Sequence, residues 1–172
     1  MKNGIAVGVG LVLAFIVQTA VLPACGVMSI APDLIFALII PAALLWQPVP
    51  VALMGAAAGL LLDIFFGHGI GLYALPYLGA TWLIGRYARQ MFNENALMPA
   101  AFAGAAFLAR EIFTLLAIYL ARMEIDITAA YVLRSLASAL LTAGLSVPLY
   151  LLSFLFVNRR DNRRSGVYHV GR

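Results

Sequence analysis

Long apolar runs alternate with short polar segments along almost the whole chain. The runs cover Gly4–Leu22, Pro32–Trp46, Val51–Phe66, Leu72–Ile84, Pro99–Leu120 and Tyr131–Val157. A helix needs about 17–25 apolar residues to cross the hydrocarbon core of a bilayer. Because each run is continuously apolar and does not alternate, we predict an all-α membrane protein with six transmembrane helices and not a β-barrel.

Helix-ending signals separate the runs, but some runs are short. Pro48 and Pro50 follow the second run, and the glycine-rich turn Gly67–Gly71 follows the third. Without such turn residues, the second, third and fourth runs fall below the length of about 17 residues that a span needs. Six full spans are therefore the main interpretation, and a re-entrant hairpin of the second and third runs is the alternative.

The composition also indicates a membrane protein. Of the 172 residues, 64% are apolar and only 10% are charged, and the mean hydropathy is +1.00. An average soluble domain is about 45–50% apolar and about 25% charged. So few charges cannot cover the surface of a soluble domain. The composition therefore excludes a soluble enzyme, a nucleic-acid-binding protein and a disordered chain.

The basic residues predict the orientation, since cytoplasmic loops carry an excess of Lys and Arg. With six spans and a cytoplasmic amino terminus, most of the 11 basic residues lie on the cytoplasmic side. These are Lys2, Arg86, Arg89, Arg159, Arg160, Arg163, Arg164 and Arg172. Arg122 lies on the outer side, and Arg110 and Arg134 lie within runs. We predict one six-helix transmembrane domain at 1–157 and a basic cytoplasmic tail at 158–172, with both termini cytoplasmic.

Cys25 is the single cysteine, so the chain has no intrachain disulfide. It lies in Leu22–Gly26, which resembles a lipoprotein cleavage box after a charge-free run. Pro23 departs from that pattern. A small thiol that is buried or faces lipid is the simpler interpretation.

Small residues recur every four positions along the third run. Gly55, Gly59 and Asp63 share one face of the predicted helix. Small residues at this spacing allow a neighbouring helix to approach closely. We therefore expect a packing face, either against another helix of the same chain or against a partner protein.

Four charged residues lie within or near the predicted hydrocarbon region: Asp63, Arg110, Glu111 and Arg134. An unpaired charge there costs at least about 2.5 kcal/mol on insertion scales. Two acids and two bases sum to zero, which predicts a network of mutual pairs. Arg110 and Glu111 are neighbours and point about 100° apart, so we expect each to pair with another helix. Helix rise favours a pair between Asp63 and Arg134. Arg110, a basic group of a partner protein and water are the alternative partners of Asp63.

Polar residues form a stripe in the sixth run and are sparse elsewhere. Arg134, Ser138 and Thr142 share one helix face, which we expect to face the bundle interior.

The chain has no Gly-x-Ser-x-Gly elbow and no His-Glu-x-x-His motif. His68 lies in the glycine-rich turn and His169 in the tail, and neither has the neighbouring ligand residues that a metal site needs. We predict no catalytic residue, no cofactor and no metal. Solute transport remains an alternative, since transporters place charges near the midplane.

A block of motifs suggests a family. It comprises Pro32-Asp33-Leu34, an apolar run, Gly59-Leu60-Leu61-Leu62-Asp63, the turn Gly67–Gly71 and a helix closed by Gly85. From Pro32 to Arg86 the chain therefore resembles the family of the bacterial rod shape-determining protein MreD. Pro32, Asp33 and Asp63 match positions of the family motif.

This resemblance implies a non-enzymatic scaffold of the bacterial inner membrane, within the machinery that builds side-wall peptidoglycan. The implied partners are the single-span protein MreC, the actin-like MreB filament, a class B penicillin-binding transpeptidase and a polytopic glycosyltransferase. The family is also similar in fold to the substrate-binding membrane subunits of vitamin transporters, so such a subunit is the alternative function. The tail Arg159–Arg164 either only sets the topology or contacts anionic lipid or a filament.

Overall fold

The computed structural model describes residues 2–21, 24, 30–66, 71–88, 97–122 and 128–165. In these residues the regular structure is entirely helical, which confirms the predicted all-α fold. The elements are α1 (Lys2–Ile16), η1 (Val17–Val21), α3 (Leu34–Leu45), α4 (Pro48–Phe66), α5 (Ala74–Tyr87), α6 (Leu97–Leu120) and α7 (Ala129–Ser165). The turn η1 is π-helical and continues α1.

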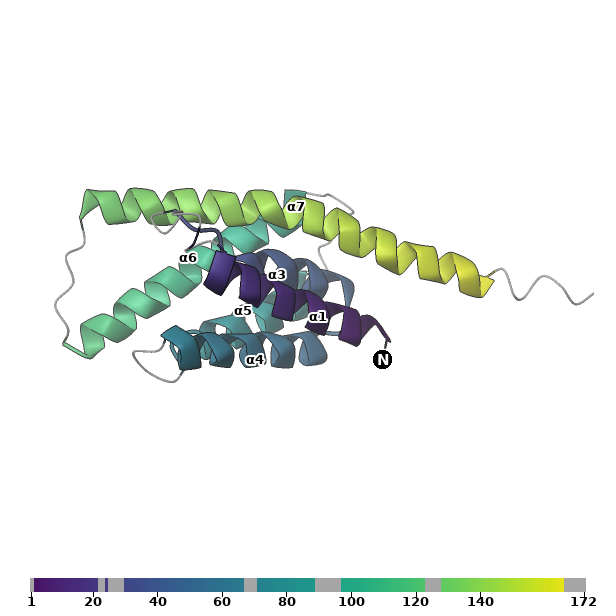
Figure 1. Ribbon diagram of the computed structural model, residues 1–172, viewed down its shortest axis with the longest axis horizontal. Helices are drawn as coiled ribbons and strands as arrows, with labels where there is room; N and C mark the ends of the chain where they lie inside the picture. Colours follow the sequence, from purple (N-terminus) through teal and green to yellow (C-terminus); the bar gives the residue numbers. More distant parts are fainter. Residues whose placement is uncertain are drawn as a thin grey trace, which may run out of the picture.

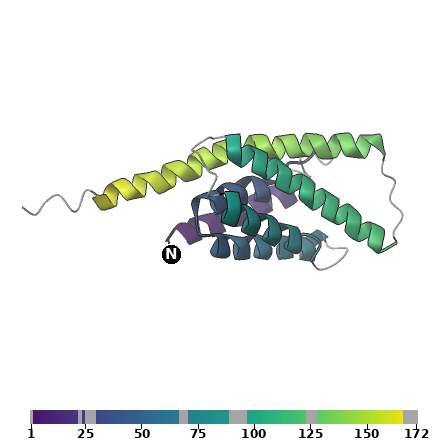
Figure 2. The same ribbon diagram turned by 180° about the vertical axis from the view of Figure 1, so that it is seen from behind.

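Each predicted run corresponds to one of the α-helices, with shifted ends. The helix α4 begins at Pro48, because a proline in the first turn of a helix has no N–H hydrogen bond to lose. The helix α7 continues past the predicted end at Val157 to Ser165, so it includes the start of the basic tail. Its axis bends near the middle, where Pro148 lies (Figures 1 and 2). This bend is the one that proline in a helix interior predicts.

Three helical segments of the described residues are long and apolar enough to cross a membrane: Pro48–Phe66, Leu97–Leu120 and Ala129–Ser153. Ala6–Val21 and Leu34–Leu45 are apolar but shorter. With 12 residues, α3 is about 18 Å long, well below the hydrocarbon thickness of about 30 Å. The apolar helices identify a membrane protein, while the number of spans and the side of each terminus remain predictions.

The short helix α3 lies at the centre of the bundle. It contacts α1, α4, α5, α6 and α7, and the ribbon shows it behind α1 and between α7 and α4 (Figure 1). Ile35, Phe36 and Ile39 are completely buried. A helix that is apolar on all sides is stable when other helices surround it. The hydrophobic core of the protein is therefore built around α3.

The small-residue face of α4 packs against α5. A Cβ atom added to Gly59 would lie 2.6 Å from the Cα atom of Ala74 and 2.8 Å from the carbonyl oxygen of Tyr73. A Cβ atom on Gly55 would lie 3.0 Å from Oγ1 of Thr81. Of the two interpretations of this face, the structure supports packing within the chain, because α5 already covers it.

Some sequence predictions fall outside the described residues. They include Cys25, on which the cleavage-box interpretation depends, and 67–70 of the glycine-rich turn. The last part of the basic tail, 166–172, also lies outside them.

Replacing Gly59 by alanine should lower the free energy of unfolding by about 1–3 kcal/mol, the usual cost of overpacking. The added Cβ would meet backbone atoms of Tyr73 and Ala74, which can move only if α4 and α5 separate. Thermal unfolding of the purified protein in detergent measures the change.

Gly79→Ala is the matched control for this experiment. An added Cβ at Gly79 meets nothing within 4 Å, and alanine is the better helix former. This variant should therefore be as stable as the wild type or slightly more stable. Equal melting temperatures for the two variants would show that α4 and α5 do not approach closely at Gly59.

Candidate functional site

Asp33 caps the amino-terminal end of the central helix α3. Its Oδ1 atom accepts hydrogen bonds from the backbone N–H groups of Ile35 at 3.1 Å and Phe36 at 3.0 Å. Its backbone carbonyl accepts the N–H of Ala37 at 3.0 Å. Aspartate is a preferred residue at this position, because its carboxylate satisfies N–H groups that have no partner within the helix.

Two other elements complete this cap. The Oε1 atom of Gln18 in η1 accepts the N–H groups of Leu34 at 3.0 Å and Ile35 at 3.3 Å. The N–H of Asp33 itself donates to Oγ1 of Thr142 in α7 at 2.9 Å. Side chains from distant parts of the sequence therefore satisfy the start of α3 inside the protein.

The second carboxylate oxygen of Asp33, Oδ2, binds two further helices. It accepts a hydrogen bond from the hydroxyl of Tyr77 in α5, and it lies 3.4 Å from Nη1 of Arg110 in α6. The ring of Tyr77 stacks on Phe36, with the ring centroids 4.0 Å apart and the planes at 9°. Asp33 is only 1% exposed, so this one carboxylate joins α3, α5 and α6 deep in the bundle.

Arg110 lies between two carboxylates. Its Nη2 atom donates to Oε1 of Glu111, and Oε2 of Glu111 accepts the hydroxyl of Tyr131 in α7 at 2.7 Å. The guanidinium also lies 4.6 Å from the ring centroid of Phe107, in cation–π geometry. A buried cation is tolerated only when such partners compensate its charge. Asp33, Glu111, Arg110 and Tyr131 are therefore one connected cluster.

The contact between Arg110 and Glu111 corrects a prediction. We expected these sequence neighbours to pair only with other helices, because their Cα–Cβ bonds point about 100° apart. The long arginine side chain bridges that angle and reaches the neighbouring carboxylate. Arg110 does also pair with another helix, through Asp33.

The predicted pair between Asp63 and Arg134 is wrong. The carboxylate of Asp63 accepts the backbone N–H groups of Gly71 at 2.7 Å, Tyr73 at 2.8 Å and Ala74 at 3.2 Å. It therefore serves the start of α5 as Asp33 serves the start of α3. Backbone donors can compensate a buried carboxylate as a cation does. Asp63 is 3% exposed and lies against the start of α5, whereas Arg134 is an exposed residue of α7.

The structure therefore brings together only part of the predicted charge network. Arg110 and Glu111 meet, Arg134 lies nearby, and Asp63 lies elsewhere. The acid that the network lacked is Asp33, which entered the sequence analysis only as a family-motif position. A local signal for its role exists, because an aspartate directly before an apolar run is typical of a helix start.

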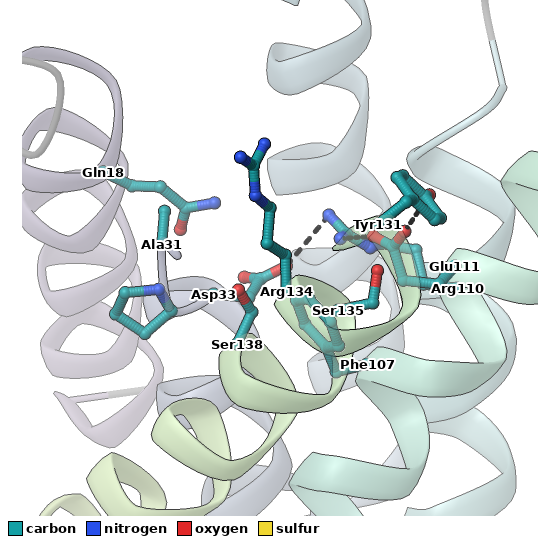
Figure 3. Close-up of a pocket in the computed structure, with 11 residues that line it drawn as sticks. Gln18, Ala31, Asp33, Phe107, Arg110, Glu111, Tyr131, Arg134, Ser135 and Ser138 are labelled. Carbon is teal, nitrogen blue, oxygen red and sulfur yellow. Dashed lines mark hydrogen bonds and ion pairs between the residues drawn. The ribbon is translucent and has the colours of Figure 1, made fainter. Parts of the chain in front are cut away.

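A cavity of about 420 Å³ lies beside this cluster (Figure 3). Side chains from η1, from the segment before α3, from α6 and from α7 line it. They include Gln18, Pro32, Asp33, Arg110, Glu111, Tyr131 and Arg134.

Of the predicted α7 stripe, Ser138 and Thr142 are buried in the bundle interior as expected, while Arg134 is exposed.

The cluster has few free groups for chemistry. The oxygens of Asp33 and Glu111 accept hydrogen bonds from α3, Tyr77, Arg110 and Tyr131. Among the residues that the structure describes, no three or more His, Cys, Asp or Glu side chains gather as a metal site. The cluster therefore holds helices together and shapes the cavity wall.

The family model of the rod shape-determining protein MreD matches residues 3–160. The chain belongs to the MreD family. The match includes α1 to α6 and most of α7, so the buried cluster and the cavity lie within the family region. No curated protein and no solved structure matches the chain. Membership confirms the resemblance found in the sequence and implies a role in rod shape determination.

Asp33→Asn should lower the free energy of unfolding by about 3–5 kcal/mol, the usual cost of breaking a buried ion pair. The amide can still cap α3 with its oxygen, but it leaves Arg110 with less compensation. Combining it with Arg110→Met should recover part of the loss, because no cation is then buried and Glu111 keeps its hydrogen bond from Tyr131. Chemical or thermal unfolding in detergent measures this double-mutant cycle. Strictly additive losses would exclude the pair.

A second cycle tests the role of Asp63. Asp63→Asn should cost about 1–3 kcal/mol, because one amide oxygen replaces two charged acceptors for three backbone N–H groups. Adding Arg134→Gln should give additive effects, since the structure shows no contact between these side chains. Recovery in the double variant, measured by the same unfolding assay, would restore the rejected pair.

Proposed function

We propose that this MreD-family protein is a non-enzymatic membrane scaffold of the complex that builds side-wall peptidoglycan during cell elongation. The observation that carries this proposal is the family match, which extends over nearly the whole chain. The buried acids agree with it, because they hold helix starts and an arginine and do not form an acid–base pair in an open site.

The proposed partners follow from the family. They are an MreC-like single-span protein, a class B penicillin-binding transpeptidase, a polytopic glycosyltransferase and the actin-like MreB filament. Large apolar side chains on several helices are exposed, among them Ile64, Ile112 and Leu133. In a membrane such faces contact either lipid tails or helices of partners. We therefore place the partner contacts mainly between helices within the membrane.

The proposed topology has six spans, both termini in the cytoplasm and the inner membrane as location. The excess of basic residues on one side supports it. The shortness of α3 is compatible with this topology, because five other helices contact it and side chains cap its start. The end of α7 then lies on the same side of the membrane as the start of α1, and Figure 1 shows these two helix ends at the same end of the bundle.

The topology is tested with periplasmic reporter fusions. We expect active reporters after Gly69 and Glu124, and silent reporters after Gln47, Arg89 and Arg164. A cytoplasmic reporter at the same positions should give the inverse pattern, which controls for expression. An active periplasmic reporter at Arg89 would overturn the six-span topology.

The cavity is the one observation that favours the alternative, a substrate-binding membrane subunit of a small-solute transporter. Its volume of about 420 Å³ falls in the usual range for ligand sites, about 300–1,000 Å³. Such a subunit would need an energy-coupling ATPase pair, which a cell-wall scaffold does not.

Co-purification in a mild detergent, with mass spectrometry, distinguishes the two functions. The scaffold predicts recovery of an MreC-like protein with the transpeptidase and glycosyltransferase, and loss of rod shape when the chain is depleted. An unrelated polytopic protein with the same tag is the control. Recovery of an ATPase pair with a bound vitamin, and unchanged cell shape on depletion, would replace the scaffold by the transporter subunit.

A further inference from the structure

The wall of the cavity combines occupied acceptors with free donors. Both oxygens of Asp33 and both oxygens of Glu111 accept hydrogen bonds from the protein. Arg110 faces these two acids, so its charge is compensated. The oxygens of the two acids are therefore already engaged by the protein, which leaves the other polar groups of the cavity to bind a ligand.

Arg134 is the cation of this wall that lacks an acid. Its side chain forms no ion pair or hydrogen bond with any residue in the described part of the chain. In Figure 3 its guanidinium extends over the cavity, away from the cluster of Asp33, Arg110 and Glu111. A planar guanidinium presents several N–H donors in a fork that matches the oxygens of a phosphate or carboxylate.

Gln18 adds a second donor on the opposite wall, whose NH₂ group has no hydrogen bond to the residues that the structure describes. Its Oε1 atom must be the carbonyl oxygen, because it accepts the backbone N–H groups of Leu34 and Ile35. The side-chain NH₂ group therefore points away from α3, and Figure 3 shows it directed toward the guanidinium of Arg134. Two donor groups from η1 and α7 thus converge on one space, and neither is hydrogen-bonded to a residue that the structure describes.

Arg134 lies near the first end of α7, from which its long side chain can extend to the headgroup layer of a bilayer. It is five residues beyond Ala129, the first residue of α7, which is about 8 Å along the helix. Lipid headgroups occupy the outer part of a bilayer, which is about 40–45 Å thick overall against about 30 Å of hydrocarbon. The nearby Tyr131 is of a type enriched at this interface.

We propose that this cavity binds the phosphate of a membrane lipid headgroup, with Arg134 and the amide of Gln18 as its donors. The cavity volume of about 420 Å³ is larger than a bare phosphate needs and has room for the group attached to it. The site lies between helices of a membrane protein, where lipid is the most concentrated source of phosphate. This site is independent of the proposed scaffold role, since a scaffold without bound lipid would still recover its partners.

Native mass spectrometry of the purified protein in detergent tests the proposal. The probes are phosphatidylglycerol, a diacylglycerol with the same acyl chains but no phosphate, and soluble glycerol 3-phosphate. We expect one saturable phosphatidylglycerol adduct, at least about tenfold weaker binding of the diacylglycerol, and no displacement by glycerol 3-phosphate at equal concentration.

Three variants assign the binding to this cavity. Arg134→Gln should weaken phosphatidylglycerol binding about tenfold or more, as expected for loss of a hydrogen bond to a charged group. Gln18→Glu keeps the acceptor that α3 needs but replaces the donor by a negative charge, so it should weaken binding similarly. Arg86→Gln removes an exposed arginine outside the cavity and should bind like the wild type.

Loss of lipid binding can be distinguished from loss of folded protein. Arg134 is exposed and makes no internal bond among the described residues, so Arg134→Gln should melt at the wild-type temperature. Unchanged phosphatidylglycerol binding in this variant would overturn the proposal, as would equal binding of the diacylglycerol. Displacement by glycerol 3-phosphate would also overturn it, because the cavity would then take a soluble phosphate.

Discussion

A single buried carboxylate at the start of the central helix is the interaction on which most of this structure depends. Asp33 satisfies N–H groups of α3 with one oxygen and binds Tyr77 and Arg110 with the other. The helix begins inside the protein, where water cannot replace these bonds, and each unsatisfied group would cost about 1–3 kcal/mol. Because α3 contacts five other helices, its position sets that of the whole bundle.

The same solution recurs at α5, where Asp63 binds the first backbone N–H groups. Both α3 and α5 are shorter than a bilayer is thick, with 12 and 14 residues. Helix ends inside a membrane are tolerated where protein and not lipid surrounds them. Two buried acids thus make short helices possible, and Gly55 and Gly59 bring α4 and α5 together.

The distribution of charge explains how the interior and the cavity differ. Arg110 lies between the carboxylates of Asp33 and Glu111, and all three side chains are largely buried. Such a cluster is costly to open, so it acts as a rigid part of the bundle. Arg134 remains outside it, with its donors directed to the cavity. A member of the MreD family thereby combines a fixed interior with one polar site and with apolar outer faces for lipid or partner helices.

The sequence by itself determined the class of protein, the existence of the helices and the close packing face of α4. These properties are local: apolar run length, turn residues and the four-residue spacing of Gly55 and Gly59 are visible along the chain. It also indicated the MreD family, which the family match confirmed.

Only the tertiary structure decided which charges meet. We predicted the Asp63–Arg134 pair from depth along the helices. Depth gives only the position along the membrane normal, whereas pairing also depends on which helices are neighbours. The central position of α3 brings Asp33 to Arg110, 77 positions apart in the sequence, and places α5 over Asp63. A carboxylate can be compensated by a cation or by backbone N–H groups, and nothing in the order of residues distinguishes these two outcomes.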